Sequence, residues 1–143
     1  MAVSNIYHIN DSNFDKVTMR SKVPVLIDFY ADWCGPCRTL SAIMEKVAAK
    51  YNEQILFCKM NVDESPHTPD RYKINAIPTV IIFKDGLAAE KIVGLHDADF
   101  YSEVLDRLLN DANEEKESDD VLSGLVEDTA DGTDVVDGIS EEN

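Results

Sequence analysis

The chain has 143 residues, of which 44% are apolar, enough for one ordinary domain with a packed core and an appendage. Its formal net charge of -15 is unevenly placed: residues 111–143 carry 13 acidic side chains and one lysine, a net of -12, whereas residues 1–110 carry 15 acidic and 12 basic side chains, a net of -3. Neither part is basic, which argues against direct binding to nucleic acid or to an anionic membrane surface.

The N-terminal segment gives no sign of an export signal. Residues 1–11 contain neither a basic stretch nor an apolar run of the kind a signal peptide has. No apolar run elsewhere in the sequence approaches the roughly 20 residues needed to span a bilayer. We therefore expect a cytoplasmic protein without a membrane anchor. In a reducing compartment, a Cys-x-x-Cys pair indicates redox chemistry or metal binding rather than a structural disulfide.

The first predicted elements are a short strand and a short helix. Residues 6–9 alternate weakly between apolar and polar side chains, as in a half-buried strand. Phe14 and Val17 have the spacing of one inward helix face, and Asp11 or Ser12 is expected to cap that helix.

The middle of the chain predicts a buried strand, a long helix and a second strand. Residues 23–30 are almost continuously apolar, which is typical of a central strand buried on both faces. Residues 40–51 place apolar side chains at helical spacing, and residues 55–62 have the composition of another strand. We interpret residues 66–72 as a loop leading into a short helix.

The last predicted elements are a hairpin and a helix. Residues 79–83 and 89–93 flank Asp85-Gly86, a pair typical of a tight hairpin turn. Asp97 is expected to cap a final helix with one apolar face. That face is formed by Phe100, Val104, Leu105, Leu108 and Leu109. This order predicts an α/β fold in which a mixed sheet lies between helices, with its first three strands pairing in parallel.

Residues 111–143 are expected to form a disordered acidic tail beyond a folded domain at residues 1–110. The tail has no aromatic residue and is rich in Asp, Glu, Gly, Ser and Thr, so it cannot bury enough surface to order itself. Two small apolar clusters interrupt it: Val121, Leu122, Leu125 and Val126, and then Val135, Val136 and Ile139. The first cluster has the spacing of a short helical segment.

The motif with the clearest chemistry is Cys34-Gly35-Pro36-Cys37, between the predicted buried strand and the long helix. A helix starting at Cys34 directs unpaired N–H groups and the positive end of its dipole at the first sulfur. Both favour the thiolate, so we expect Cys34 to be the attacking group. Cys37, one turn later, is placed to resolve the mixed disulfide. Pro36 stiffens the loop, and Gly35 leaves the sulfurs uncrowded.

The alternative interpretation of the pair is half of a structural zinc site, which requires two further ligands. The other candidates, His8, Cys58, His67 and His96, are scattered and form no second Cys-x-x-Cys or His-x-x-x-His pattern. We therefore expect redox chemistry and no bound metal. Cys58 falls in a predicted strand and is interpreted as a small buried apolar residue.

The cysteine motif is part of a longer resemblance. The segment Tyr30-Ala31-Asp32-Trp33-Cys34-Gly35-Pro36-Cys37-Arg38 resembles the active-site stretch of the thioredoxin family. The similarity continues, in the family's order and spacing, through Lys59-Met60-Asn61-Val62-Asp63, Ile77-Pro78-Thr79, Phe83-Lys84-Asp85-Gly86 and Val93-Gly94. It covers about residues 3–110 and implies the thioredoxin fold, whereas nothing in the tail matches. The Trp-Cys-Gly-Pro-Cys core is far more specific than a bare Cys-x-x-Cys.

Two places depart from the family pattern. Ala42 lies where the family commonly has a proline in the active-site helix, so we expect this helix to be less kinked. Leu95 and His96 follow Gly94 where smaller or apolar residues are usual, and they could change which partners fit.

Asp28 and Lys59 are predicted to support the cysteines. Asp28 interrupts an otherwise apolar strand, where burial would raise its pKa. The resemblance identifies it as the family's buried acid, which would accept and return the proton of Cys37; the alternative is an Asp that tilts to an edge and meets solvent. The resemblance also implies that Lys59 lies near this acid and favours its carboxylate form. Without the resemblance, Lys59 would be expected simply to face water.

Four residues are predicted to contact the substrate. Ile77 precedes Pro78, and the resemblance implies a cis bond between them that places this loop against the disulfide. The backbone of Ile77 would then be free to pair with an extended substrate segment. Trp33 and Gly94 are expected to form an apolar rim around the reactive thiol, with Tyr30 beneath; the alternative for a single Trp is core filling.

The resemblance implies a general protein-disulfide reductase. Its partners would be disulfide-containing proteins and a flavoprotein thioredoxin reductase that recycles it with NADPH, and we expect a monomer. The chain has no Gly-rich nucleotide loop, so no cofactor of its own is expected. Two alternatives stay open: a dedicated electron donor to one enzyme, and a redox-independent binding module whose acidic tail docks a partner. The competing interpretation of the tail, which we favour, is a solvated extension.

Overall fold

A computed structural model describes residues 5–122 of the chain, including the side chains of residues 5–111. The chain divides into two compact units, Met1–Ser102 and Glu103–Asn143, and the last helix runs across the division. The elements are β1 (Ile6–His8), α1 (Phe14–Arg20), β2 (Val25–Tyr30), α2 (Gly35–Lys50), β3 (Leu56–Asn61), α3 (His67–Arg71), β4 (Thr79–Lys84), β5 (Leu87–Val93) and α4 (Ala98–Leu122). The predicted strands and helices are therefore present in the predicted order.

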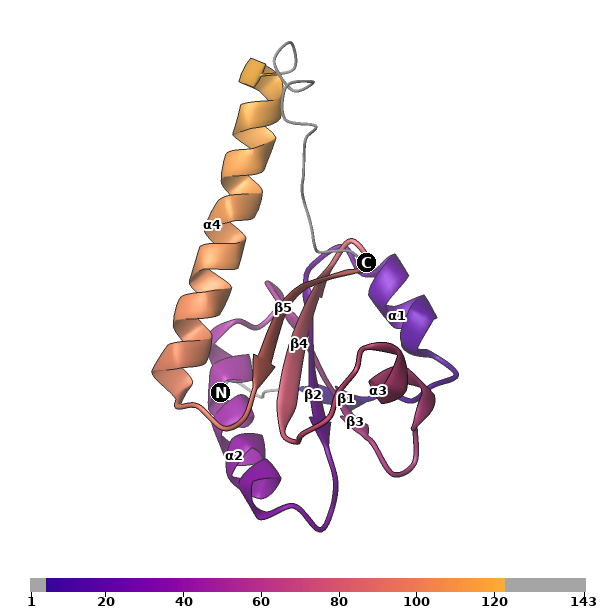
Figure 1. Ribbon diagram of the computed structural model, residues 1–143. Coiled ribbons are helices and arrows are strands. Elements are labelled where there is room, and N and C mark those ends of the chain that lie inside the picture. Colours follow the sequence, from indigo (N-terminus) through magenta and orange to yellow (C-terminus); the bar gives the residue numbers. More distant parts are fainter. Residues whose placement is uncertain (1–4, 123–143) are drawn as a thin grey trace. The chain divides into compact units, whose positions relative to one another are not determined.

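Five strands form one mixed sheet in the order β1-β3-β2-β4-β5 (Figure 1). β1 and β2 each pair with β3 in parallel, whereas β2 with β4 and β4 with β5 pair antiparallel. Figure 1 shows α2 on one face of this sheet and α1 and α3 on the other. The predicted fold class is confirmed, as is the parallel pairing of the first three strands.

β2 is buried because it has a strand on each side and helices over both faces. Residues 25–29 are all buried, none of them more than 2% exposed. Side chains alternate along a strand, so the odd-numbered residues of this run pack with Phe14 of α1 in one core cluster. The even-numbered Leu26 and Asp28 project to the opposite face, toward α2. A strand enclosed in this way is normally apolar throughout, which makes Asp28 the exception.

An aromatic cluster closes the α1 face of the sheet. The ring centroid of Phe14 lies 5.2 Å from that of Phe83 and 5.6 Å from that of Tyr72, both in edge-to-face geometry. Tyr72 and Phe83 complete the triangle at 5.2 Å. Such pairs contribute roughly 0.5–1.5 kcal/mol each beyond the area they bury. The cluster therefore ties α1 to β4 and to the segment that follows α3.

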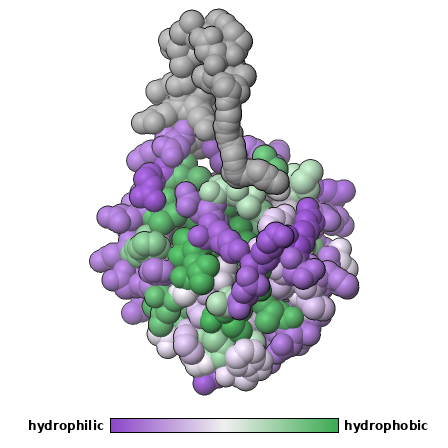
Figure 2. All heavy atoms as spheres, in the orientation of Figure 1, coloured by the Kyte–Doolittle hydropathy of each residue, from purple (hydrophilic) through white to green (hydrophobic). Residues whose placement is uncertain are grey.

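The turn between β4 and β5 is the predicted Asp85-Gly86 pair. Both residues have positive φ angles, 55° and 81°, as a two-residue turn matched to the twist of a hairpin requires. A β-carbon at Gly86 would also lie 2.6 Å from the sulfur of Met19, although that exposed side chain could move away, so the positive φ is the main reason for glycine here. β5 is an edge strand with Leu87 and Val93 exposed, and Figure 2 shows apolar side chains, in green, where Figure 1 places β4 and β5.

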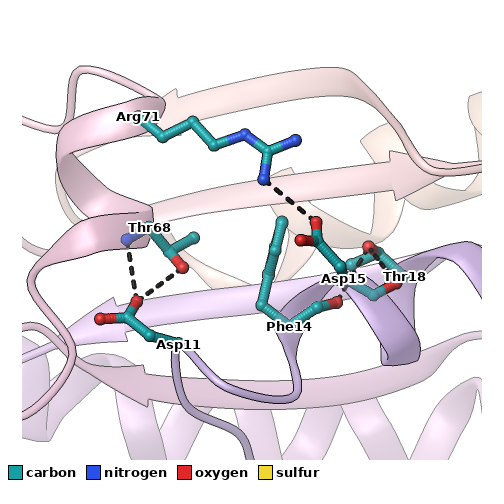
Figure 3. Close-up of polar contacts among 6 residues, drawn as sticks. All are labelled: Asp11, Phe14, Asp15, Thr18, Thr68 and Arg71. Carbon is teal, nitrogen blue, oxygen red and sulfur yellow. Dashed lines mark hydrogen bonds and ion pairs between the residues drawn. The ribbon is translucent and has the colours of Figure 1, made fainter.

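The predicted cap of α1 is wrong, because neither Asp11 nor Ser12 caps that helix. Asp11 caps α3 instead: its carboxylate accepts hydrogen bonds from the backbone N–H groups of His67 (3.0 Å) and Thr68 (2.8 Å). It also accepts from the Thr68 hydroxyl at 2.7 Å, and Figure 3 shows both Thr68 bonds. Near the start of α1, the side-chain oxygen of Asn10 accepts hydrogen bonds from the backbone N–H groups of Ser12 and Asn13. The sequence pointed to α1 because Asp11 lies just before that helix, and residue spacing cannot show that α3 lies beside Asp11 in the fold.

α4 begins where predicted and ends later than expected. Asp97 accepts a hydrogen bond from the backbone N–H of Phe100 at 2.9 Å, which confirms it as the cap. The helix passes the boundary expected at residue 110 and runs to Leu122, because Ala, Glu and Lys in this stretch are good helix formers. Residues 123–143, which hold the second apolar cluster, lie outside the described residues. Within the described part of the chain, no helix is long and apolar enough to cross a bilayer.

Replacing Asp11 with Ala should lower the free energy of unfolding by about 1 kcal/mol, the usual cost of losing a helix cap. Burial alone would raise the pKa of Asp11, but the hydrogen bonds from Thr68 and His67 outweigh it and lower that pKa below 3.8. The carboxylate therefore stabilises the fold above the pKa of the unfolded chain, and this contribution is lost as the pH falls through the lowered value. Urea unfolding of the oxidised protein, at neutral and at acid pH, measures the difference.

The control for this variant is Asp15→Asn. Asp15 pairs with Arg71 at 3.0 Å, but the two side chains are 73% and 57% exposed, so losing the pair should cost less than about 0.5 kcal/mol. If Asp11→Ala were no less stable than this control at neutral pH, the cap would contribute nothing to the fold.

Candidate active site

Cys34 and Cys37 lie at the start of α2 and form a disulfide, with their Cα atoms 5.3 Å apart. Cys34 is the N-cap residue of the helix, and its sulfur accepts a hydrogen bond from the backbone N–H of Cys37 at 3.2 Å. Pro36 occupies the first turn, where an N–H would have no partner within the helix. The sulfur of Cys34 therefore lies at the positive end of the α2 dipole, as the sequence predicts.

The loop around the cysteines is held by local hydrogen bonds. The backbone N–H of Cys34 donates to the carbonyl of Ala31 at 3.2 Å, and the guanidinium of Arg38 donates to the carbonyl of Asp32 at 2.9 Å. At Gly35, a β-carbon would meet only Arg38, at an ordinary 3.9 Å, so the fold itself does not demand glycine there.

The disulfide is sheltered, and the loop before β4 lies against it. Cys34 is 5% exposed and Cys37 is 2% exposed, in a small apolar cluster with Ala31. Ile77 packs against this cluster, and the bond between Ile77 and Pro78 is cis. The structure thus brings the predicted loop to the cysteines, as the family resemblance implied.

Trp33 stands at the surface beside Cys34. Its side chain is 70% exposed, which excludes core filling. The indole Nε1 donates a hydrogen bond to the carboxylate of Asp63 at 2.8 Å, so the ring is held in place although water surrounds it. Asp63 is the last residue of the segment 59–63 that resembles the family, but sequence spacing alone does not indicate that it accepts a hydrogen bond from the indole.

Gly94 lies beside the proline loop. Its backbone N–H donates to the carbonyl of Pro78 at 2.8 Å, and its own carbonyl accepts from the hydroxyl of Tyr101 at 3.3 Å. Its φ of 91° is a conformation that favours glycine, although a β-carbon would meet nothing within 4 Å. Gly94 is therefore tied to the loop that contains Pro78, and Tyr30 packs against the cysteine cluster.

Asp28 is a buried acid. Its side chain is 2% exposed, and burial raises its pKa to about 7, although the charge of Lys59 acts in the opposite direction. Among the side chains of residues 5–111, none donates a hydrogen bond to Oδ1 of Asp28. The alternative of an Asp that reaches solvent at an edge is therefore wrong. Its position on the α2 face of β2 is the one that proton exchange with Cys37 would require.

Lys59 lies beside Asp28 but is anchored elsewhere. The two residues are register partners on the parallel strands β2 and β3. The ammonium of Lys59 donates to the hydroxyl of Ser41 at 3.1 Å and lies 4.4 Å from the ring centre of Tyr30. Lys59 therefore does not simply face water. Ser41 was not predicted from the sequence; the available signal was its place one helical turn after Cys37, on the same side of α2.

The third cysteine is separate from the pair. Cys58 is buried among the side chains that face α1, on the opposite side of the sheet from Asp28. Its 1% exposure confirms it as a buried apolar residue, and this burial raises the pKa of its thiol to about 12. Within the described residues, His, Cys, Asp and Glu side chains do not gather in the groups of three that a metal ion would need.

Comparison with known proteins agrees with this geometry. The family described as Thioredoxin matches residues 5–107. A chloroplastic M-type thioredoxin of Pisum sativum is 43% identical over 93 residues, which are 65% of this chain and 54% of the pea protein. A thioredoxin of Rickettsia bellii is 42% identical over 89 residues, 62% of this chain and 85% of the relative. Thioredoxin 1 of Synechococcus elongatus is 38% identical over 101 residues, 71% of this chain and 94% of the relative. The chain therefore spans about half the length of the pea relative and most of the two bacterial ones.

Replacing Asp28 with Asn should remove a pH-dependent cost of burying this carboxyl. Its pKa is about 7 in the folded protein and near 3.8 in the unfolded chain, so the unfolded chain loses its proton first as the pH rises. The stability of the wild type relative to the variant should therefore fall from about pH 4 to about pH 7 and then level off. The fall is on the order of 4 kcal/mol. Denaturant unfolding of both oxidised proteins across this range measures it, and a constant difference would contradict the burial of the acid.

Proposed function

This chain belongs to the thioredoxin family, and on that premise we propose that it is a general protein-disulfide reductase. The observation that carries the proposal is the Cys34–Cys37 disulfide at the N-terminus of α2, beside the exposed Trp33. The two cysteines are only three residues apart, so their bond closes a very short loop and constrains the unfolded chain little. That favours a working bond over a structural one.

The proposed reaction transfers two electrons from the dithiol to a substrate disulfide. In the reduced protein, the Cys34 thiolate attacks one sulfur of the substrate; a mixed disulfide forms and the other substrate sulfur leaves as a thiolate. Cys37 then loses its proton and attacks the sulfur of Cys34, which releases the second substrate thiolate and restores the Cys34–Cys37 disulfide. The N–H of Cys37 at 3.2 Å and the helix dipole support Cys34 as the thiolate.

Asp28 is proposed as the acceptor of the Cys37 proton. A carboxyl with a pKa of about 7 can accept and return a proton near neutral pH, which an ordinary Asp does poorly. Its placement on the face of β2 that α2 covers supports this role. Lys59 is proposed to act through Asp28, because its charge favours the ionised carboxyl.

The proposed docking surface surrounds the sheltered disulfide. Trp33 and Gly94 border it, and the backbone of Ile77 before Pro78 would pair with an extended substrate segment. Leu95, one of the departures from the family pattern, is 41% exposed next to Gly94 and adds apolar surface there. Main-chain pairing with an apolar border suits many unrelated proteins, which favours a general reductase over a dedicated donor.

The oxidised protein would be recycled by a flavoprotein thioredoxin reductase that uses NADPH. We place the cycle in the cytoplasm, where disulfides are kept reduced, and propose that the protein acts as a monomer. A chloroplastic relative shares 43% identity over 93 residues, so a plastid is the competing location.

The roles of the cysteines can be separated by reducing insulin disulfides with a small dithiol as the electron source. Cys34→Ser should lose all turnover above the background of the dithiol, because the attacking sulfur is gone. Reduced Cys37→Ser, freed of the small dithiol before it is mixed with insulin, should accumulate a covalent adduct because the mixed disulfide cannot be resolved; mass spectrometry without reductant detects it.

The matched control is Cys58→Ala, which removes the thiol that faces α1 and should leave turnover unchanged. If the folded, fully reduced wild type showed no turnover, the general-reductase proposal would be wrong, and a dedicated donor or a redox-independent binding module would remain.

We further propose that residues 1–110 carry the reductase activity and that the acidic extension acts as a solvated tail. Residues 111–143 contain 13 acidic side chains and one lysine. Deleting them should leave the rate of insulin reduction unchanged, because no residue of the proposed site is removed. A loss of binding to one particular partner, with insulin reduction intact, would instead favour the tail as a docking segment.

A further inference from the structure

The ammonium group of Lys59 is held by two side chains that the proposed mechanism does not use. Its Nζ donates a hydrogen bond to the Ser41 hydroxyl at 3.1 Å and lies 4.4 Å from the centre of the Tyr30 ring. Ser41 is on α2, one turn after Cys37, and Tyr30 is the last residue of β2. The lysine therefore bridges the sheet and α2 close to the cysteines.

Asp28 is the partner that Lys59 would be expected to have. The register of β2 and β3 places Asp28 beside Lys59, with both side chains on the α2 face of the sheet. Nevertheless, among the side chains that the structure describes, no ion pair joins the two, and Oδ1 of Asp28 has no hydrogen-bond donor. A hydrogen bond from an ammonium is about twice as strong as a neutral one, so Ser41 is a substantial anchor.

Lys59 is the one described cation whose charge acts on Asp28. The other described titratable groups that interact with this carboxyl are the phenols of Tyr30 and Tyr101, whose ionisation it disfavours. Neither of these can supply a positive charge. Burial sets the raised pKa of Asp28, and the distance of the Lys59 ammonium determines how far a positive charge lowers it again.

We propose that Ser41 is a positioning residue for the proton acceptor: by anchoring the Lys59 ammonium on α2, it prevents a close ion pair with Asp28 and keeps that carboxyl available for proton exchange. This inference rests on the proposed function of the site and assigns to Ser41 a role that acts through Lys59. Without the hydroxyl, the ammonium is free to turn toward the carboxyl of its register partner, whose Oδ1 has no donor among the described residues.

The test is a titration of Asp28 by carbon-13 NMR in the oxidised protein, where Cys37 cannot titrate with it. Ser41→Ala should lower the measured pKa of Asp28 by about 1, a tenfold change in its dissociation constant. Ser41→Thr keeps the hydroxyl and should retain the wild-type value. The pH dependence of insulin reduction should move to lower pH by the same amount in Ser41→Ala, because the carboxylate is then present at lower pH.

The matched background is Lys59→Met, in which replacing Ser41 with Ala should leave the Asp28 titration unchanged. The inference is overturned if Ser41→Ala leaves the pKa of Asp28 unchanged or raises it, or if the same shift appears in the Lys59→Met background. The titration needs no turnover, so it can fail or succeed independently of the reductase assay. Ala is a better helix former than Ser, so the variant keeps α2 intact.

Discussion

β2 is paired on both edges and covered on both faces, and the position of every group in the site depends on this enclosure. The strand ends at Tyr30, and within a few residues the chain turns into α2, so the first turn of that helix lies at the end of the most constrained element of the sheet. Cys34 is therefore held by the sheet through a short loop rather than by a long flexible one. The same enclosure fixes Asp28 beneath α2 and sets its register with Lys59 on β3.

The enclosure also explains why the site is chemically unusual. A carboxyl in the middle of a buried strand has lost its contact with water, and the described side chains give Oδ1 no donor in return. An apolar residue of similar size would stabilise the strand more, so Asp28 is a place where local stability is given up. The neighbouring Lys59 offsets this loss of stability only in part, because its ammonium is directed toward the Ser41 hydroxyl and the Tyr30 ring. As a result, the Asp28 carboxyl has a pKa of about 7, so its protonated and ionised forms coexist at neutral pH.

Sequence patterns predicted the elements of this fold well, because most of the signals are local. The buried run at residues 23–30, the Asp85-Gly86 turn and the Asp97 cap depend on residues within a few positions of one another, and all three are confirmed. The errors and omissions involve contacts between distant segments. Asp11 caps a helix more than fifty residues away, Asp63 holds the indole of Trp33, and Ser41 holds Lys59. The spacing of residues along a strand or helix carries no information about such partners.

The hydrogen bonds of Asp11 couple α3 to the loop that precedes α1. α3 has five residues, far fewer than an isolated helix needs in water, and its own N-cap position is a proline that offers no side-chain acceptor. Its N-terminal N–H groups are instead capped by Asp11, in the loop before α1. We therefore expect α3 and this loop to unfold together as one cooperative unit. Since the chain after α3 leads directly to Ile77 and Pro78, transient opening at the N-terminus would be transmitted to the wall of the disulfide. The stability of the loop before α1 would thus influence how well Ile77 stays packed against the cysteines.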